Sequence, residues 1–197
     1  AELDRWILSE LADFTGRCRQ AYEAYEFHAV YHALNNFCSI ELSSLYFDIV
    51  KDRLYCSART SRERRSAQTA MHEIVKVLAG VIAPVMPFTA EEVWEHLPAD
   101  PAGREASVHL TLFPEIDESE LDEDLAGRWQ RLIELREDVL KELEKTRQNR
   151  GLGSALNAKV KIAASEEFRT FLEPYLGDLP ALFIVSAVEA EGGGPNP

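Results

Sequence analysis

Apolar residues return every three or four positions along the first half of this chain, the spacing that places them on one face of an α-helix. The spacing predicts a long helix from Leu3 to Tyr25 and a second from Phe27 to Ile49, with a break near Asn35-Asn36. A third helix is predicted over residues 67–82 and should end before Pro84, because proline cannot continue a helix.

A short fourth helix is predicted around Trp94. Thr89 and Glu92, three residues apart, have the spacing of a capping box, in which each side chain bonds the backbone of the other. Four helices with short connections predict an antiparallel helix bundle over residues 1–98. Proline, glycine and charged residues then dominate residues 99–119, where we expect a connecting strap that includes an extended run, Ser107–Pro114.

The second half mixes helical and strand-like patterns. An acidic stretch leads into a helix with an apolar stripe from Leu121 to Leu143, which ends among basic residues before Gly151. Residues 156–162 alternate as a half-exposed strand does, Ser165 is placed to cap a short helix, and residues 182–188 are a second strand candidate. The predicted fold is therefore mainly α, a bundle followed by a small α+β subdomain over residues 120–190, with a disordered tail over 191–197.

Composition restricts the class of protein. The chain has 197 residues, 46% of them hydrophobic, and a formal net charge of −13. No apolar run approaches the eighteen or so residues of a membrane span, and the start lacks a secretion leader. Three cysteines, Cys18, Cys38 and Cys56, give neither an even disulfide framework nor a paired zinc motif, so we expect reduced, mostly buried thiols. These features favour a cytoplasmic protein that does not bind membranes. We expect it to be a monomer and not to bind DNA.

Catalytic motifs are hard to find. His28 and His32 are four apart on a predicted helix, but the glutamate of a zinc-protease helix is missing between them. Gly151 and Gly153 follow a helix rather than a strand, so they indicate a turn and not a dinucleotide loop. Trp6, Trp94 and Trp129 lie within helical stripes, where core packing is the expected role. A small metal enzyme using His28, His32 and Glu26 remains an alternative.

The charge changes sign between residues 51 and 65, here called the basic segment. Six cations face two anions in it, a local charge of +4 inside an acidic chain. Such a concentration favours contact with a polyanion, although charge runs also serve as solvated loops. Within it Tyr55 is placed to stack on an unpaired base. A second basic group begins in the last turns of the long helix and includes Lys145, Arg147 and Arg150, where simple compensation of the helix C-terminus is an equal alternative.

Several runs of sequence resemble one family. They are Tyr25-Glu-Phe-His, Asn36 through Tyr55, Arg64-Arg-Ser-Ala-Gln-Thr-Ala, and Ala83-Pro-Val-Met-Pro-Phe-Thr-Ala-Glu-Glu-Val-Trp. In this order and spacing they resemble the anticodon-binding helical domain of class I aminoacyl-tRNA synthetases of the isoleucine, valine and leucine branch. The Phe-Cys-Ser run and the Ser107-Val-His-Leu run are most similar to the bacterial isoleucyl enzymes.

The resemblance implies a module that binds the anticodon stem and loop of isoleucine tRNA and serves a ligase, with valyl, leucyl and protein-interaction modules as alternatives. The activation signatures and the editing insertion are missing, so the chain is expected to be a fragment cut near Pro197 and not an enzyme by itself. It would hold no cofactor; ATP, magnesium and a structural zinc would belong to the parent protein, as would its catalytic and editing domains. The expected tRNA-binding residues are Lys51, Arg53, Tyr55, Arg59, Arg62, Arg64, Arg65, Lys145, Arg147 and Arg150.

Overall fold

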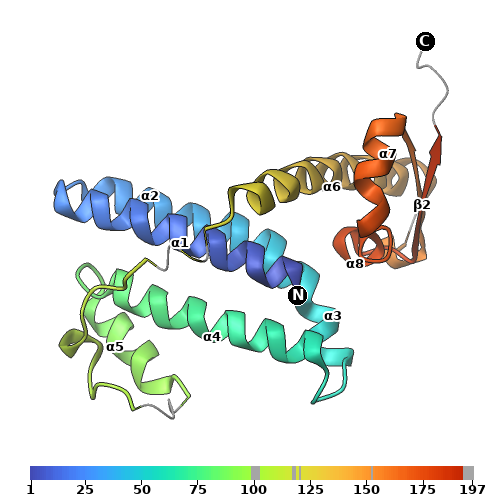
Figure 1. Cartoon of the computed structure of the whole chain (residues 1–197). Helices are drawn as coiled ribbons and strands as arrows, with labels where there is room; N and C mark the ends of the chain where they lie inside the picture. Colours follow the sequence, from blue (N-terminus) through green and yellow to red (C-terminus); the bar gives the residue numbers. More distant parts are fainter. Residues whose placement is uncertain (99–102, 117–118, 120, 152, 193–197) are drawn as a thin grey trace. The chain divides into compact units, whose positions relative to one another are not determined.

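The chain forms two compact units, Ala1–Ala126 and Gly127–Pro197, in the computed structural model (Figure 1). The structure describes residues 1–98, 103–116, 119, 121–151 and 153–192, without the side chain of residue 150. Parts of the expected strap, of the acidic stretch and of the tail therefore lie outside the described residues. Among those described, no helix has both the length and the apolar character needed to cross a bilayer.

Unit 1 is built from α-helices that run back and forth. Helix α1 (Glu2–Glu23) is followed by one continuous helical rod made of α2 (Phe27–Asn36), the π-helix η1 (Phe37–Tyr46) and α3 (Phe47–Cys56). Helices α4 (Arg62–Ile82) and α5 (Pro87–His96) complete the bundle (Figure 1). The break expected near Asn35-Asn36 falls where the backbone changes from α to π hydrogen bonding, and the axis continues through it.

The core of unit 1 lies where these helices meet. Phe14 of α1 stacks on Phe37 of η1 with their ring centroids 4.6 Å apart, and both side chains are fully buried. Burial of this kind contributes roughly 1.5–3 kcal/mol for each large apolar side chain. Trp6 and Trp94 are also buried, as expected from their helical stripes.

The strap packs against the bundle and belongs to unit 1. Its expected extended run contains a short 3₁₀ turn, η2 (Val108–Leu110), with Ser107 accepting a hydrogen bond from the backbone N–H of His109. Glu91 of α5 accepts hydrogen bonds from the Ser107 hydroxyl and the Val108 N–H at 2.8 and 3.1 Å. The expected capping box at Thr89 is wrong, because α5 begins earlier, at Pro87, where the missing N–H of proline costs nothing.

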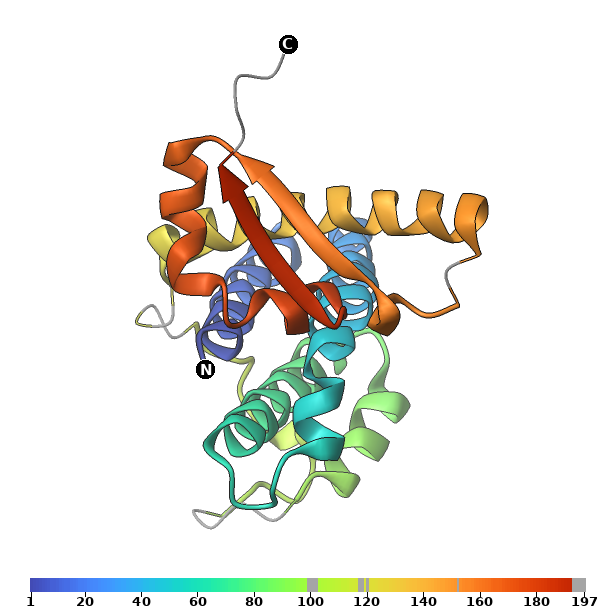
Figure 2. The same cartoon turned by 90° about the vertical axis from the view of Figure 1, so that its right-hand side faces the viewer.

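Helix α6 (Glu123–Arg150) begins in unit 1 and continues as the main helix of unit 2. Two parallel strands, β1 (Lys159–Ala164) and β2 (Ala187–Gly192), pair with Lys159 opposite Ala187 (Figure 2). Helices α7 (Glu166–Leu172) and α8 (Leu179–Phe183) connect the strands. Ser165 caps α7 as predicted, accepting from the N–H of Phe168.

Both strands lie further along the chain than predicted. Residues 155–157 form a 3₁₀ turn, η4, and β1 starts after it; residues 182 and 183 belong to α8, and β2 extends to Gly192, into the expected tail. A short apolar run cannot distinguish a buried helical turn from a strand, and the pairing between the strands decides where each begins. The mainly α fold with a small α+β part is confirmed.

Candidate nucleic-acid interface

The basic segment comprises the last turns of α3, the loop after it and the first turn of α4, at one end of unit 1 (Figure 2). Two serines fix the loop between the helices. The Ser61 hydroxyl accepts from the N–H of Arg64 and so caps α4, and the Arg64 guanidinium donates to the carbonyl of Ser57 at 3.2 Å. Arg64 is therefore half-buried and ties the loop to the first turn of α4.

Three arginines of this loop and turn remain exposed: Arg59, Arg62 and Arg65. Their side chains form no ion pair within the described parts of the chain. Arg62, Arg64 and Arg65 all lie in the first turns of α4, at the positive end of the helix dipole. Each cation there is opposed by roughly 0.3–1 kcal/mol, whereas an anion is attracted. This arrangement opposes helix stability and favours a bound anion such as phosphate.

Arg53 does not belong to the exposed group. Its side chain is only 18% exposed, and its Nη1 lies 3.8 Å from a carboxylate oxygen of Asp4, itself a buried residue. Asp4 also accepts hydrogen bonds from the hydroxyls of Tyr46 and Ser66, at 2.8 and 2.6 Å. The geometry thus gives Arg53 an internal role, neutralising a buried carboxylate that joins α1, η1 and α4.

Tyr55 and Lys51 lie on the exposed side of α3. Tyr55 is 84% exposed at the last turn of α3, open to stack on a planar partner. Lys51 pairs with Asp48 at 3.0 Å, one turn earlier on the same rod. Exposed pairs of this kind contribute at most about 1 kcal/mol, so Lys51 could exchange Asp48 for a phosphate at little cost.

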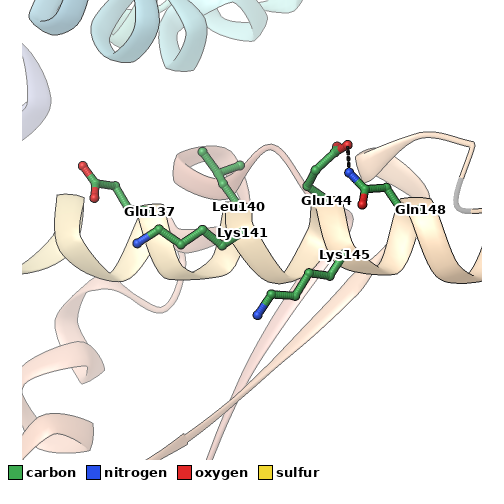
Figure 3. Close-up of a pocket in the computed structure, with 6 residues that line it drawn as sticks. All are labelled: Glu137, Leu140, Lys141, Glu144, Lys145 and Gln148. Atoms are coloured by element: carbon green, nitrogen blue, oxygen red, sulfur yellow. Dashed lines mark hydrogen bonds between the residues drawn. The ribbon is translucent and has the colours of Figure 1, made fainter.

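The second basic group lies on α6 in unit 2 and is balanced by acids. Lys141 pairs with Asp138 at 3.2 Å, and Arg147 pairs with Glu144 at 3.5 Å. Lys145 likewise pairs with Glu142. The wide hollow of about 540 Å³ on this helix, shown in Figure 3, is lined by two lysines, two glutamates, Leu140 and Gln148. The described part of this group therefore offers a charge-neutral surface, and α6 supplies no cationic patch comparable to the basic segment.

The described residues give no support for a metal site or for a reactive thiol at Cys18. His28 and His32 are exposed on α2, and no group of three or more histidine, cysteine, aspartate or glutamate side chains in the described ranges could hold a metal ion. Burial raises the pKa of the Cys18 thiol to about 11. Cys56 is exposed at the end of α3, so the expectation of mostly buried thiols is wrong for this residue.

Sequence reasoning missed the residues that organise the interface. Ser61 could have been found, since a serine directly before a helix is a common N-cap. The contact between Asp4 and Arg53 could not, because it joins positions 49 apart in sequence and depends on how α1 packs against the rod.

The helical fold and the cationic end of unit 1 agree with a comparison of sequences. Residues 4–162 match the anticodon-binding domain of tRNA ligase, and the chain belongs to this family.

Three of the relatives that it matches are isoleucine–tRNA ligases. The chain is 48% identical over 189 residues to that of Syntrophotalea carbinolica, covering 95% of this chain and 20% of the relative. It is 44% identical over 198 residues to that of Geobacter sulfurreducens, covering 100% of this chain and 21% of the relative. That of Symbiobacterium thermophilum is also 44% identical, with coverage of 99% and 21%. The chain thus spans about a fifth of the length of these curated relatives.

Proposed function

We propose that this chain is the module of an isoleucine–tRNA ligase that binds the anticodon stem and loop of isoleucine tRNA. The observation that carries the proposal is the set of exposed arginines at the start of α4, which form no ion pair with any described residue, in an acidic chain of this family. A net charge of −13 repels RNA at long range, so a local cationic end is where a hairpin can approach.

The residues divide into two roles. Arg59, Arg62 and Arg65 neutralise phosphates, which orients the hairpin but carries no sequence information. Tyr55 stacks on an unpaired loop base, an interaction of roughly 1–3 kcal/mol per base in other single-strand binders. Arg64 holds the loop, and Arg53 supports the fold beneath it. Lys145, Arg147 and Arg150 remain candidates for a weaker, second contact.

Activation of isoleucine with ATP and magnesium, its transfer to tRNA and any editing would be carried out by other parts of the parent ligase. We also place a structural zinc outside this chain, because its three cysteines lack the paired spacing of a zinc motif. We place the parent in the cytoplasm, as a monomer that serves translation.

The test is a charge reversal of the exposed arginines. The double variant Arg62→Glu, Arg65→Glu should bind isoleucine tRNA more weakly, and the slope of log K against log salt should flatten by about 1.4–1.8, two phosphate contacts at 0.7–0.9 each. Acidic residues suit the start of a helix, so these substitutions should not unfold α4.

The matched control is Arg17→Glu, Arg169→Glu, which changes the charge equally at two exposed sites outside both basic groups. It should leave the slope unchanged. Equal slopes for the wild type and the Arg62, Arg65 variant would exclude the basic segment from the interface. Lys145→Glu, Arg147→Glu tests the second group in the same titration.

A further inference from the structure

Exposed residues on the rod from Phe27 to Cys56 recur in pairs at regular intervals of four. Positions 27–28, 31–32, 35–36, 39–40 and 43–44 are exposed, and after a half-buried pair at 47–48 the pattern resumes at 51–52 and 55–56. We call the first five pairs the uncharged stripe; its members are Phe27, His28, Tyr31, His32, Asn35, Asn36, Ser39, Ile40, Ser43 and Ser44.

The π-helix keeps this stripe on one side of the rod. In an α-helix of 3.6 residues per turn, a four-residue repeat advances about 40° around the axis at each step. The π-helix η1 places more residues in each turn and so turns the repeat back the other way. The result is a track of 18 residues, roughly 27 Å long at 1.5 Å per residue, that drifts less around the rod than it would on an α-helix throughout.

The composition of the stripe is unusual for this chain. Charged residues make up 28% of the sequence, yet none of the ten stripe residues is Asp, Glu, Lys or Arg. Tyr31 and Ile40 are 65% and 60% exposed, and within α2 only Val30 is buried. A bundle helix normally buries a broad apolar face, and the stripe is a second face of α2 and η1 that no described residue of unit 1 covers.

RNA is a poor fit for this face. No lysine or arginine occurs between residues 27 and 50, and affinity for a phosphate backbone depends on nearby cations. A helix is a better fit, because the small side chains of Ser39 and Ser43 lie on either side of the large Ile40. Small residues beside a large one leave a groove that the ridge of a second helix can enter.

We propose that an α-helix with an uncharged face lies along the stripe, and that it comes from the part of the ligase chain outside these 197 residues. The assignment of the parent rests on the proposed function. The curated relatives are about five times as long as the part that matches here, so such a protein has the sequence to supply this helix.

The test compares thiol accessibility in two proteins. Ser43→Cys, in a Cys38→Ser, Cys56→Ser background, is labelled with a maleimide in the 197-residue chain and in the full-length ligase. We expect the full-length protein to react at least about tenfold more slowly, the ratio for a covering contact of roughly 1.4 kcal/mol. Glu95→Cys, exposed on α5, is the control and should react alike in both proteins.

A second variant keeps the test independent of one site. Ser43→Arg should leave the urea midpoint of the 197-residue chain unchanged, because the site is exposed there. In the full-length ligase it should displace the helix and raise the labelling rate of Ser39→Cys in the same background.

Three results would overturn the proposal: equal labelling of Ser43→Cys in both proteins, protection that appears only when tRNA is added, or protection of the 197-residue chain that grows with its own concentration. The last two would assign the stripe to RNA or to a second copy. Loss of the proposed function would show separately, as a tRNA affinity that does not respond to the Arg62, Arg65 reversal.

Discussion

Glu41 is a half-buried carboxyl at the contact between η1 and α1. Its Oε2 atom is buried without a hydrogen-bond partner in the described part of the chain. Burial raises the pKa of Glu41 to about 7, and the negative charges of Glu10 and Asp13 act in the same direction against the opposing effect of Arg17. The pKa of Glu10 is also raised, chiefly by burial. Two acids with raised pKa values thus share one interface.

This predicts a loss of stability as the pH rises. In the folded state Glu41 keeps its proton up to about pH 7, whereas in the unfolded state it loses the proton near its ordinary pKa of 4.5. The free energy of unfolding therefore falls between about pH 4.5 and 7 and stays low above pH 7. Because water screens this half-exposed site, we expect the total loss of unfolding free energy to be about 1–2 kcal/mol. Glu41→Gln should therefore be more stable than the wild type at pH 8 and similar at pH 5, in urea unfolding.

Glu95→Gln, an exposed site on α5, is the control for removal of one acid. Its difference from the wild type should be small at both pH values. If Glu41→Gln changed the unfolding free energy equally at pH 5 and pH 8, a raised pKa of Glu41 in the folded state would be ruled out.

The basic segment shows how far single residues could be predicted. Its sign reversal is a property of the sequence, and six of its residues could be named as candidates from charge and spacing alone. Their division into exposed Lys51, Arg59, Arg62 and Arg65, half-buried Arg64 and inward Arg53 depends on packing and distant partners. Charge patterns locate an interface, but packing decides which cations reach it.

At the scale of elements, α4 and the strap approach unusually closely at Gly80. A Cβ built there would lie 2.7 Å from Cγ of Pro114, which is a stiff ring. The strap has little room to retreat, since the carbonyl of Pro114 accepts from Arg19 at 2.7 Å and the Arg19 guanidinium lies over the Phe113 ring. Glycine is therefore required by space at this position rather than by backbone conformation.

Gly80→Ala should destabilise the chain by up to about 2 kcal/mol, because an overpacking cost of roughly 1–3 kcal/mol is only partly offset by the gain of about 1 kcal/mol that alanine normally gives within a helix. Gly127→Ala in α6 is the matched comparison, since no atom lies within 4 Å of the added methyl group. That variant should gain about 0.5–1 kcal/mol. Urea unfolding of both checks the pair, and equal shifts of the same sign would contradict a tight contact at Gly80.

The helices could be predicted where a long apolar period continued over several turns, as in α1, α4 and α6. The strands could not be placed, because each is six residues long and its limits come from its partner. In the sequence pattern, the only sign of the π-helix is the break predicted near Asn35-Asn36, directly before it. Its hydrogen-bonding pattern depends on how the rod packs on α1, which no local spacing reveals.

At the scale of the whole molecule, the negative net charge of the chain and the positive charge of the basic segment affect RNA binding over different distances. The screening length is about 30 Å at 0.01 M ionic strength and about 10 Å at 0.1 M. Direct phosphate contacts by Arg62 and Arg65 should therefore matter in both conditions, while repulsion by remote acids should appear only at low salt.

Glu23 and Glu26 test this separation of distances. The start of α1 is joined to α4 near the basic segment by the bond from Ser66 to Asp4, and these two glutamates lie at the other end of α1, whose 22 residues span roughly 33 Å. Removing both charges with Glu23→Gln, Glu26→Gln should strengthen tRNA binding about twofold at 0.01 M salt, because each lies at about one screening length from the bound phosphates and repels several of them. At 0.2 M the gain should vanish, whereas the weakening by Arg62→Glu, Arg65→Glu should remain measurable. Should the glutamate variant gain as much at 0.2 M as at 0.01 M, those residues would have to touch the RNA, and the hairpin would then lie along α1 rather than at the end formed by α3 and α4.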